Sequence, residues 1–184
     1  MKKRVLKVLI IILLVLIALY KINIIINKQL EKKQIESYIK YSSTYNYYYK
    51  PLLVIPKIKL YATIVKANSD YSNLDKSLVY YKSFNPNEKI IVFGHSGAGY
   101  GTFFSRLSEL NYGDNTYIYY NDTCYKYKVN KVKYIDETNM DILNNDRNNG
   151  LLYLITCTKK DKNKRLLIVL RQENSAKAQK ISKK

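Results

Sequence analysis

A long apolar stretch lies near the start of the chain. From Val8 to Ile26 every residue is apolar or aromatic except Lys21 and Asn23. This length is close to the ~20 residues that a helix needs to cross a bilayer. The stretch is apolar all round, whereas a surface helix of a soluble domain is apolar on one face. The pattern predicts a transmembrane helix, with residues 1–26 forming the cytoplasmic flank and the membrane anchor.

A cleaved signal peptide is the alternative interpretation. Its apolar core spans ~7–15 residues and ends at a small-residue cleavage site, which the sequence from Tyr20 to Ile24 does not offer. The apolar stretch is preceded by basic residues, namely Lys2, Lys3, Arg4 and Lys7. Positive charge on this flank favours a cytoplasmic N-terminus. We therefore expect a single-pass cell-membrane protein whose following domain is extracellular.

Residues 27–50 are polar and predict a solvated stalk. The helix could continue from Gln29 to Tyr41, and the tyrosines at 45–49 could alternatively form an aromatic belt on the membrane surface. From residue 51 the apolar positions follow a different pattern. Ile58, Leu60, Ala62 and Ile64 alternate with polar or half-polar residues, which is typical of a half-buried strand.

Short strand-like runs separated by turn residues continue to residue 173. The expected strands cover residues 52–55, 58–64, 78–81, 89–93, 116–120, 125–129, 132–135, 151–157 and 165–171. About eight short strands at this spacing predict an all-β sandwich or barrel over residues 51–173. A short helix is expected at Phe103–Leu110, and the lysine-rich residues 174–184 are expected to be disordered.

The charge of the chain narrows its possible partners. Lys and Arg outnumber Asp and Glu by 32 to 14, which gives a net charge of +18. Nucleic acid, an anionic membrane surface and an anionic cell wall are the candidate partners. An extracellular domain argues against nucleic acid. One histidine and two cysteines are fewer than the usual zinc ligands, and we expect neither a metal nor another cofactor.

Two residues at strand ends are the first candidates for chemistry. Cys157 ends the apolar run 151–157, and His95, the single histidine, opens the glycine-rich loop 96–101 after another strand. A cysteine nucleophile reacts as the thiolate and needs a partner that activates it. The structural alternatives are a small core residue for Cys157 and a loop histidine without a role for His95.

Arg165 is the third candidate. If the strands ending at Cys157 and beginning at Arg165 form a hairpin, these two residues face each other near the turn. Arg171 would share that face but lie roughly 20 Å further along the strand, and Lys164 would point to the opposite face. Arg165 is therefore the better donor to a carbonyl oxygen or oxyanion, the alternative being a solvated surface arginine.

Several segments, in this order, together resemble the sortase family, the membrane-anchored cysteine transpeptidases of Gram-positive-type bacteria. They are Leu53–Ile58, Val92–Ser96, Phe104–Leu107, Leu110–Asp114, Leu154–Cys157 and Lys164–Val169. The resemblance covers roughly Leu52 to Gln172. It implies an eight-stranded sortase-type β-barrel with short helices, preceded by the transmembrane helix.

The resemblance also implies a mechanism. Cys157 would cleave a Thr-Gly-like bond in the C-terminal LPxTG-like sorting signal of a secreted protein. Arg165 would steady the substrate or oxyanion, and Thr156 would support the Cys157 region and substrate binding. His95 would protonate the leaving amine and then deprotonate an acceptor amine of a peptidoglycan precursor or a pilin lysine. A bell-shaped pH–rate profile near neutral pH is expected.

Two departures from the family pattern affect the class. Tyr153 occupies the first Thr position of the Thr-Leu-x-Thr-Cys motif, four residues before the nucleophile. The loop from Asp136 to Gly150 is short, whereas class B sortases carry a long helix there. A class A-like or class D-like sortase is therefore favoured over class B.

Three alternatives to a transpeptidase stay open at this point. Water could resolve the thioester, which would make the protein a membrane-anchored cysteine peptidase or hydrolase. The charge could instead serve a non-catalytic cationic protein that binds the cell wall. Finally, Cys124 and Cys157 could form a structural disulfide, which an extracellular location permits.

Overall fold

The computed structural model describes residues 2–44, 50–121, 123–138, 141, 149–158, 161–173 and 179–180. The chain divides into two compact units, Met1–Tyr45 and Asn46–Lys184. The first unit holds one helix, and the second holds the strands.

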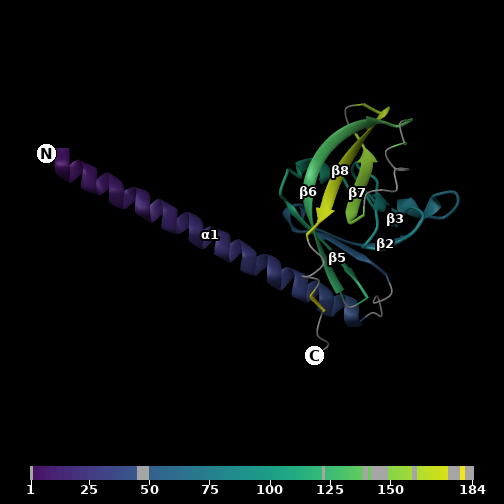
Figure 1. The fold of residues 1–184 in the computed structure, drawn as a ribbon, viewed down its shortest axis with the longest axis horizontal. Coiled ribbons are helices and arrows are strands. Elements are labelled where there is room, and N and C mark those ends of the chain that lie inside the picture. Colours follow the sequence, from purple (N-terminus) through teal and green to yellow (C-terminus); the bar gives the residue numbers. More distant parts are fainter. Residues whose placement is uncertain are drawn as a thin grey trace. The chain divides into compact units, whose positions relative to one another are not determined.

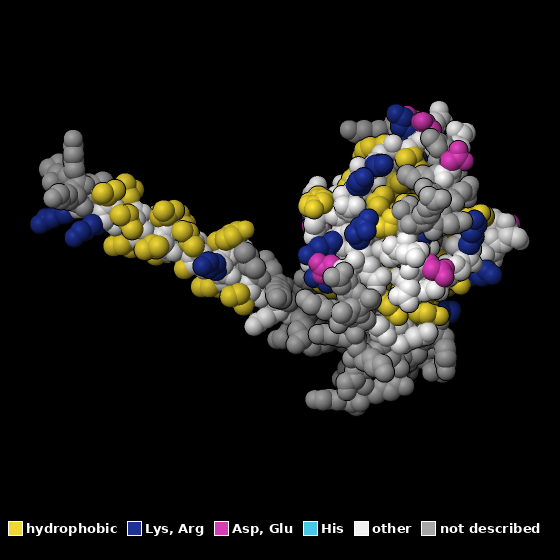
Figure 2. Space-filling model, viewed as in Figure 1, with side chains coloured by type: hydrophobic (Ala, Val, Ile, Leu, Met, Phe, Trp, Pro, Cys, Tyr) yellow, Lys and Arg dark blue, Asp and Glu magenta, His cyan; other side chains and the backbone are white. Residues whose placement is uncertain are grey.

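The first unit is the helix α1, Lys2–Thr44. Its segment Leu6–Asn23 is long and apolar enough to cross a membrane, and none of that segment is buried in the structure. Hydrophobic side chains cover the surface of this apolar segment (Figure 2). The helix continues to Thr44 through most of the range that we assigned to the stalk, while residues 45–49 lie outside the described part of the chain. The length of the apolar segment Leu6–Asn23 is suited to anchoring the protein in a membrane.

The second unit is an eight-stranded closed β-barrel (Figure 1). Its strands are β1 Leu52–Ile55, β2 Leu60–Lys66, β3 Leu78–Tyr80, β4 Ile90–Phe93, β5 Asn115–Tyr120, β6 Thr123–Asp136, β7 Leu151–Cys157 and β8 Lys164–Gln172. They follow the order β5-β1-β2-β3-β4-β7-β8-β6, and a further pairing of β5 with β6 closes the ring. The prediction of an eight-stranded barrel preceded by an apolar helix is confirmed.

A ninth short strand lies in the C-terminal tail. Among residues 174–184, for which we predicted disorder, the structure describes only β9, Gln179–Lys180. These two residues pair with Thr123 and Cys124 at the start of β6. The backbone groups of β6 thereby gain partners beyond β5 and β8.

Alternating side chains build two apolar layers on β7 and β8. Leu152, Leu154 and Ile168 belong to the large cluster that gathers side chains from all eight barrel strands. Tyr153 and Ile155 belong to a second cluster on the other face, formed by β4, β7 and β8. Apolar residues on both faces explain why the sequence of β7 is an unbroken apolar run without alternation.

Two strands differ from the sequence prediction. Pro56–Ile58 form the 3₁₀ turn η2, so that β2 begins at Leu60 rather than at residue 58. The two strands expected at 125–129 and 132–135 are one strand, β6, with a register shift between Val129 and Lys131. A β-bulge of this kind bends a strand and lets it continue. In the sequence the same irregularity breaks the alternation, and the pattern therefore predicts two strands.

The helix expected at Phe103–Leu110 is a series of turns that ends in the 3₁₀ helix η4, Leu107–Glu109. The Ser105 hydroxyl lies 2.7 Å from the carbonyl oxygen of Gly97 and 2.6 Å from that of Thr102, so its single hydrogen can be donated to either. Serine side chains that bond nearby backbone compete with a regular helix. Phe104, Leu107 and Leu110 from this segment are nevertheless buried.

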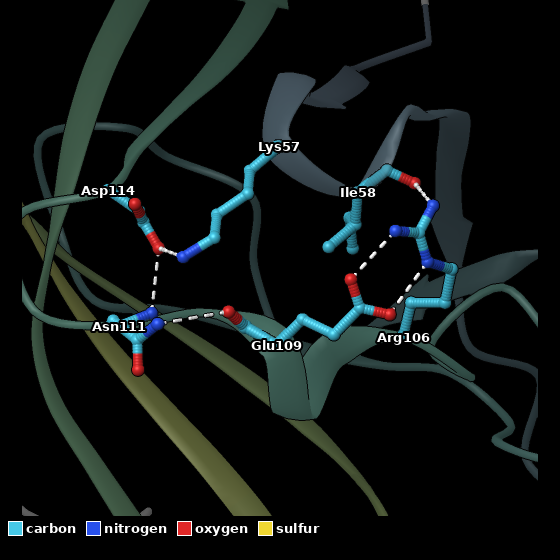
Figure 3. Close-up of polar contacts among 6 residues, drawn as sticks. All are labelled: Lys57, Ile58, Arg106, Glu109, Asn111 and Asp114. Carbon is cyan, nitrogen blue, oxygen red and sulfur yellow. Dashed lines mark hydrogen bonds and ion pairs between the residues drawn. The ribbon is translucent and has the colours of Figure 1, made fainter.

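A polar network fixes this segment to the turn between β1 and β2 (Figure 3). Arg106 forms a bidentate ion pair with Glu109, with both bonds at 2.7 Å, and donates to the Ile58 carbonyl oxygen at 3.1 Å. The hydrogen bond from Arg106 lowers the pKa of the Glu109 carboxyl. Lys57 reaches Asp114 at 2.7 Å. In the same segment, the Phe104 N–H donates to the His95 carbonyl oxygen at 2.9 Å, just after the end of β4.

Candidate active site

The backbone positions of the three candidate residues come together at one edge of the sheet formed by β4, β7 and β8. Strand β4 runs parallel to β7, with Phe93 paired with Ile155. Strand β7 runs antiparallel to β8, with Cys157 paired with Arg165. His95 follows the last residue of β4 by two positions. The structure therefore brings the ends of three strands together, as the hairpin argument required for Cys157 and Arg165.

Hydrogen bonds tie the His95 loop to the Cys157 strand. The Gly94 N–H donates to the Ile155 carbonyl oxygen at 3.2 Å. The Ser96 hydroxyl donates to the Cys157 carbonyl oxygen at 2.8 Å. Together these bonds hold the backbone on both sides of His95 beside the last residues of β7.

Thr156 adds a third bond at the same place. Its side chain is 4% exposed, and its hydroxyl donates to the Gly94 carbonyl oxygen at 2.7 Å. A buried hydroxyl needs such a partner. The sequence prediction placed Thr156 in support of Cys157, and its geometry suits a positioning role because the hydroxyl is already occupied inside the protein.

Gly94 is required by close packing at the end of β4. A Cβ atom at this position would lie 2.5 Å from Leu78 Cδ2 and 2.7 Å from Phe104 Cδ2. Any larger side chain would push the residue after β4 away from these neighbours. The glycine therefore lets Leu78 and Phe104 pack against the backbone immediately before His95.

The two cysteines have different surroundings, and both are free thiols. Cys157 is exposed and borders a cavity of about 620 Å³. This cavity is lined by Ser96, Phe104, Ser105, Ser108, Tyr134, Thr156, Cys157, Thr158, Asp161, Lys164 and Leu166. Cys124 pairs with Tyr119 at the start of β6, and burial raises the pKa of its thiol. A thiol with a raised pKa holds less thiolate at neutral pH, which makes Cys157 the better nucleophile.

Arg165 is partly covered, with 26% of its side chain exposed. Its Nη1 group donates to the carbonyl oxygens of Lys162, at 2.8 Å, and Lys164, at 3.1 Å. Its Nη2 group donates to Glu137 Oε2 at 2.6 Å. A guanidinium has five N–H groups, so these bonds leave two for a substrate oxygen. Arg171 shares the outer face, where it pairs with Leu151 at the far end of β7.

Glu137 is a residue that the sequence prediction missed. We placed it in a polar loop, and the structure sets it directly after β6, where its N–H donates to the Asn163 carbonyl oxygen at 2.8 Å. That bond joins the end of β6 to the turn between β7 and β8. No pattern in the sequence marks Glu137, because its position depends on the register of β6 with β8, in which Asp136 pairs with Lys164.

His95 also has a carboxylate partner that the sequence prediction missed. Its Nε2 atom lies 2.9 Å from Oδ1 of Asp75, which ends the 3₁₀ helix η3, Ser72–Asp75. The side chains are 39% and 77% exposed, respectively. Asp75 is 20 positions away along the chain, and no local pattern in the sequence links the two residues.

The arrangement suits acyl transfer. It offers a thiol as nucleophile, an imidazole as acid and base, and a guanidinium as donor to a developing oxyanion. Within the part of the chain that the structure describes, no group of three or more His, Cys, Asp or Glu side chains could hold a metal ion. Side chains of these three kinds, at the strand ends of one barrel, are what acyl transfer through a cysteine requires.

Residues 53–173, more than half of the chain, match the family model described as the sortase domain. The chain belongs to the sortase family. A search of curated proteins finds no match.

Solved sortase structures share the fold. Sortase A from Corynebacterium diphtheriae is 26% identical with a TM-score of 0.61, covering 68% of this chain and 61% of that chain. Sortase C-1 from Actinomyces oris is 26% identical with a TM-score of 0.60, covering 67% of this chain and 73% of that chain. Sortase A from Listeria monocytogenes, at 22% identity and a TM-score of 0.63, covers 72% of this chain and 90% of that chain and shows the likeness of fold. Sortases of two types stand at the same identity, so the comparison supports the family and not a class.

Proposed function

We propose that this protein is a membrane-anchored sortase-type cysteine transpeptidase with Cys157 as nucleophile, His95 as acid and base, and Arg165 as oxyanion donor. The observation that supports it best is the pairing of Cys157 with Arg165 across β7 and β8. The bond from Thr156 to Gly94 brings His95 to the same edge. Membership of the sortase family, whose members are cysteine transpeptidases, agrees with this assignment.

The reaction follows from these groups. The Cys157 thiolate attacks the carbonyl carbon of a Thr-Gly-like bond, and Arg165 donates hydrogen bonds to the oxyanion that forms. The imidazolium of His95 gives its proton to the leaving amine, and a thioester remains on Cys157. His95 then takes a proton from the acceptor amine, which attacks the thioester. A new amide forms and the thiolate is restored, so that atoms and charges balance over the cycle.

The substrates proposed are secreted proteins with a C-terminal LPxTG-like sorting signal. The acceptor proposed is an amine of a peptidoglycan precursor or a pilin lysine. Ser96, Ser105 and Ser108 line the cavity beside Cys157, where their hydroxyl oxygens can accept hydrogen bonds from the N–H groups of a peptide or amine substrate. The short connection between β6 and β7 supports a class A-like or class D-like member.

The proposed location is the cell membrane, with the N-terminus in the cytoplasm and the barrel outside. The apolar segment Leu6–Asn23 supports the anchor. Positive charge on the N-terminal side of that segment supports the orientation. The proposed organisation is an anchor at 1–26, a stalk at 27–50, a catalytic barrel at 51–173 and a basic tail at 174–184.

Ligation of a peptide to an amine distinguishes the transpeptidase from its alternatives. We expect the protein to join an LPxTG-type peptide to oligoglycine or a peptidoglycan-stem mimic, with the product identified by mass spectrometry. The Cys157→Ala variant is the matched control and should give no product. Hydrolysed peptide without ligated product would indicate the peptidase instead. If neither product forms across a panel of sorting signals and amines, the non-catalytic protein that binds the cell wall is the interpretation that remains.

A further inference from the structure

We propose that Asp75 is a positioning residue for His95, holding Nε2 so that Nδ1 is the nitrogen that transfers protons. The proposal rests on the proposed function, because it assigns a role within the same reaction. Its starting point is the 2.9 Å distance between His95 Nε2 and Asp75 Oδ1. Nothing else in the family assignment or in the sequence motifs calls for a carboxylate at this position.

The chemistry of the pair sets the direction of the hydrogen bond. An ionised carboxylate only accepts hydrogen bonds, so the ring must donate its Nε2–H to Asp75. In the neutral imidazole the proton then occupies Nε2, and the lone pair is on Nδ1. Nδ1 is thus free to accept a proton from an acceptor amine. When it does, the carboxylate of Asp75 stabilises the imidazolium that forms.

The loop between β2 and β3 holds Asp75 in place. The Asn73 side chain donates to the Lys66 carbonyl oxygen at 2.7 Å and accepts from the Asn68 N–H at 3.2 Å. These bonds tie the loop to the end of β2. Asp75 therefore lies at the end of a turn that these hydrogen bonds hold in place.

The same loop packs against the segment that begins at His95. Gly101 has a φ of +80°, and a Cβ atom there would overlap the carbonyl oxygen of Asp75. The ring of Tyr71 meets the ring of Phe93, the last residue of β4, edge to face, with centroids 6.4 Å apart. The loop that carries Asp75 thus contacts the chain on both sides of His95. It contacts Phe93 before the histidine and Gly101 after it.

The exposure of the pair limits the size of the effect. Asp75 is 77% exposed, so water screens its charge and the interaction is weaker than that of a buried pair. Orientation of the ring is the larger contribution. General acid–base catalysis supplies about 10²- to 10⁴-fold in rate, and loss of the orienting partner should remove about tenfold of it.

Kinetics of Asp75→Ala test the proposal. We expect kcat to fall about tenfold with KM unchanged, and Asp75→Glu, which keeps a carboxylate, to recover part of the loss. The matched control is Asp70→Ala, which removes another carboxylate from the same loop. The Asp70 carboxylate accepts a hydrogen bond from the Ser72 N–H at 3.0 Å. Asp70→Ala should stay within about twofold of wild type. An unchanged kcat in Asp75→Ala, or an equal loss in Asp70→Ala, would overturn the proposal.

The single histidine allows a second readout without substrate. In a ¹⁵N-labelled sample all imidazole signals come from His95. We expect the ¹⁵N shifts of the neutral ring to place its proton on Nε2 in wild type and in Asp70→Ala, and to show part of it moved to Nδ1 in Asp75→Ala. A ring protonated on Nδ1, or an Nε2–H signal that Asp75→Ala leaves unchanged, would overturn the proposal. If wild type transfers no acyl group, the proposed function fails, whereas this spectrum still decides whether Asp75 holds Nε2.

Discussion

Replacing His95 with alanine is expected to lower kcat for transpeptidation by about 10²- to 10⁴-fold, the usual contribution of a general acid and base. No second imidazole can take over, because the chain has one histidine. The leaving amine would depart without a proton from the enzyme, and the acceptor amine would attack without a base. Steady-state rates with a sorting-signal peptide and an acceptor amine measure the effect.

Alkylation separates a loss of chemistry from a loss of structure in this variant. Cys157 is exposed, so iodoacetamide should still modify it in His95→Ala. Cys124 should react more slowly, because burial raises the pKa of its thiol and lowers its thiolate fraction. Tyr100→Ala is the matched control in the same loop, since that side chain is 88% exposed. Wild-type turnover in His95→Ala would refute the proposed mechanism.

Replacing Arg165 with alanine is expected to lower kcat/KM by about 10²- to 10³-fold, the usual cost of removing an oxyanion donor. Arg165→Lys should restore only a small part, because an ammonium lacks the planar fork of donors. The rate of thioester formation, followed by rapid quench and mass spectrometry, reports the step in which the oxyanion forms.

Arg171→Ala is the matched control for that measurement. Arg171 lies on the same face of β8 and pairs with Leu151, at the opposite end of β7 from Cys157. Its removal takes away an equal charge without touching the site, and acylation should stay within about twofold of wild type. Equal losses in the two variants would show that net charge, rather than a donor at Arg165, supports acylation.

The sequence predicts those parts of the site that depend on neighbouring strands. The apolar run 151–157 predicts β7 with its observed bounds. A hairpin that follows it places Arg165 opposite Cys157 by counting alone, and the register confirms this pairing. The same hairpin places Lys164 on the opposite face of the strand. In agreement with this, Lys164 lines the cavity together with Leu166.

Contacts between distant segments could not be read from the pattern. The parallel pairing of β4 with β7 and the pairing of β1 with β5 join strands whose sequences carry no mark of their partners. The bulge between Val129 and Lys131 makes one strand read as two. At Phe103–Leu110 the apolar spacing of a helix is kept, but the side-chain bonds of Ser105 turn the backbone away from a helix.

The two carboxylates of the site were missed for a related reason. Asp75 and Glu137 are exposed acidic residues in polar loops, where such residues are common and need no explanation. Each gains its role only through the packing of its loop beside a residue distant in sequence, His95 or Arg165. A resemblance based on His95, Cys157 and Arg165 gives no reason to look for either.

The central claim is that Cys157 forms a thioester with the acyl part of a sorting signal, and intact-protein mass spectrometry tests it most directly. Wild type is mixed with an LPxTG-type peptide without an acceptor amine and quenched in acid. We predict a mass increase equal to the acyl fragment, located on Cys157, in wild type and in Cys124→Ala and absent from Cys157→Ala. No adduct in wild type across a panel of sorting signals, or an adduct that persists in Cys157→Ala, would contradict the account.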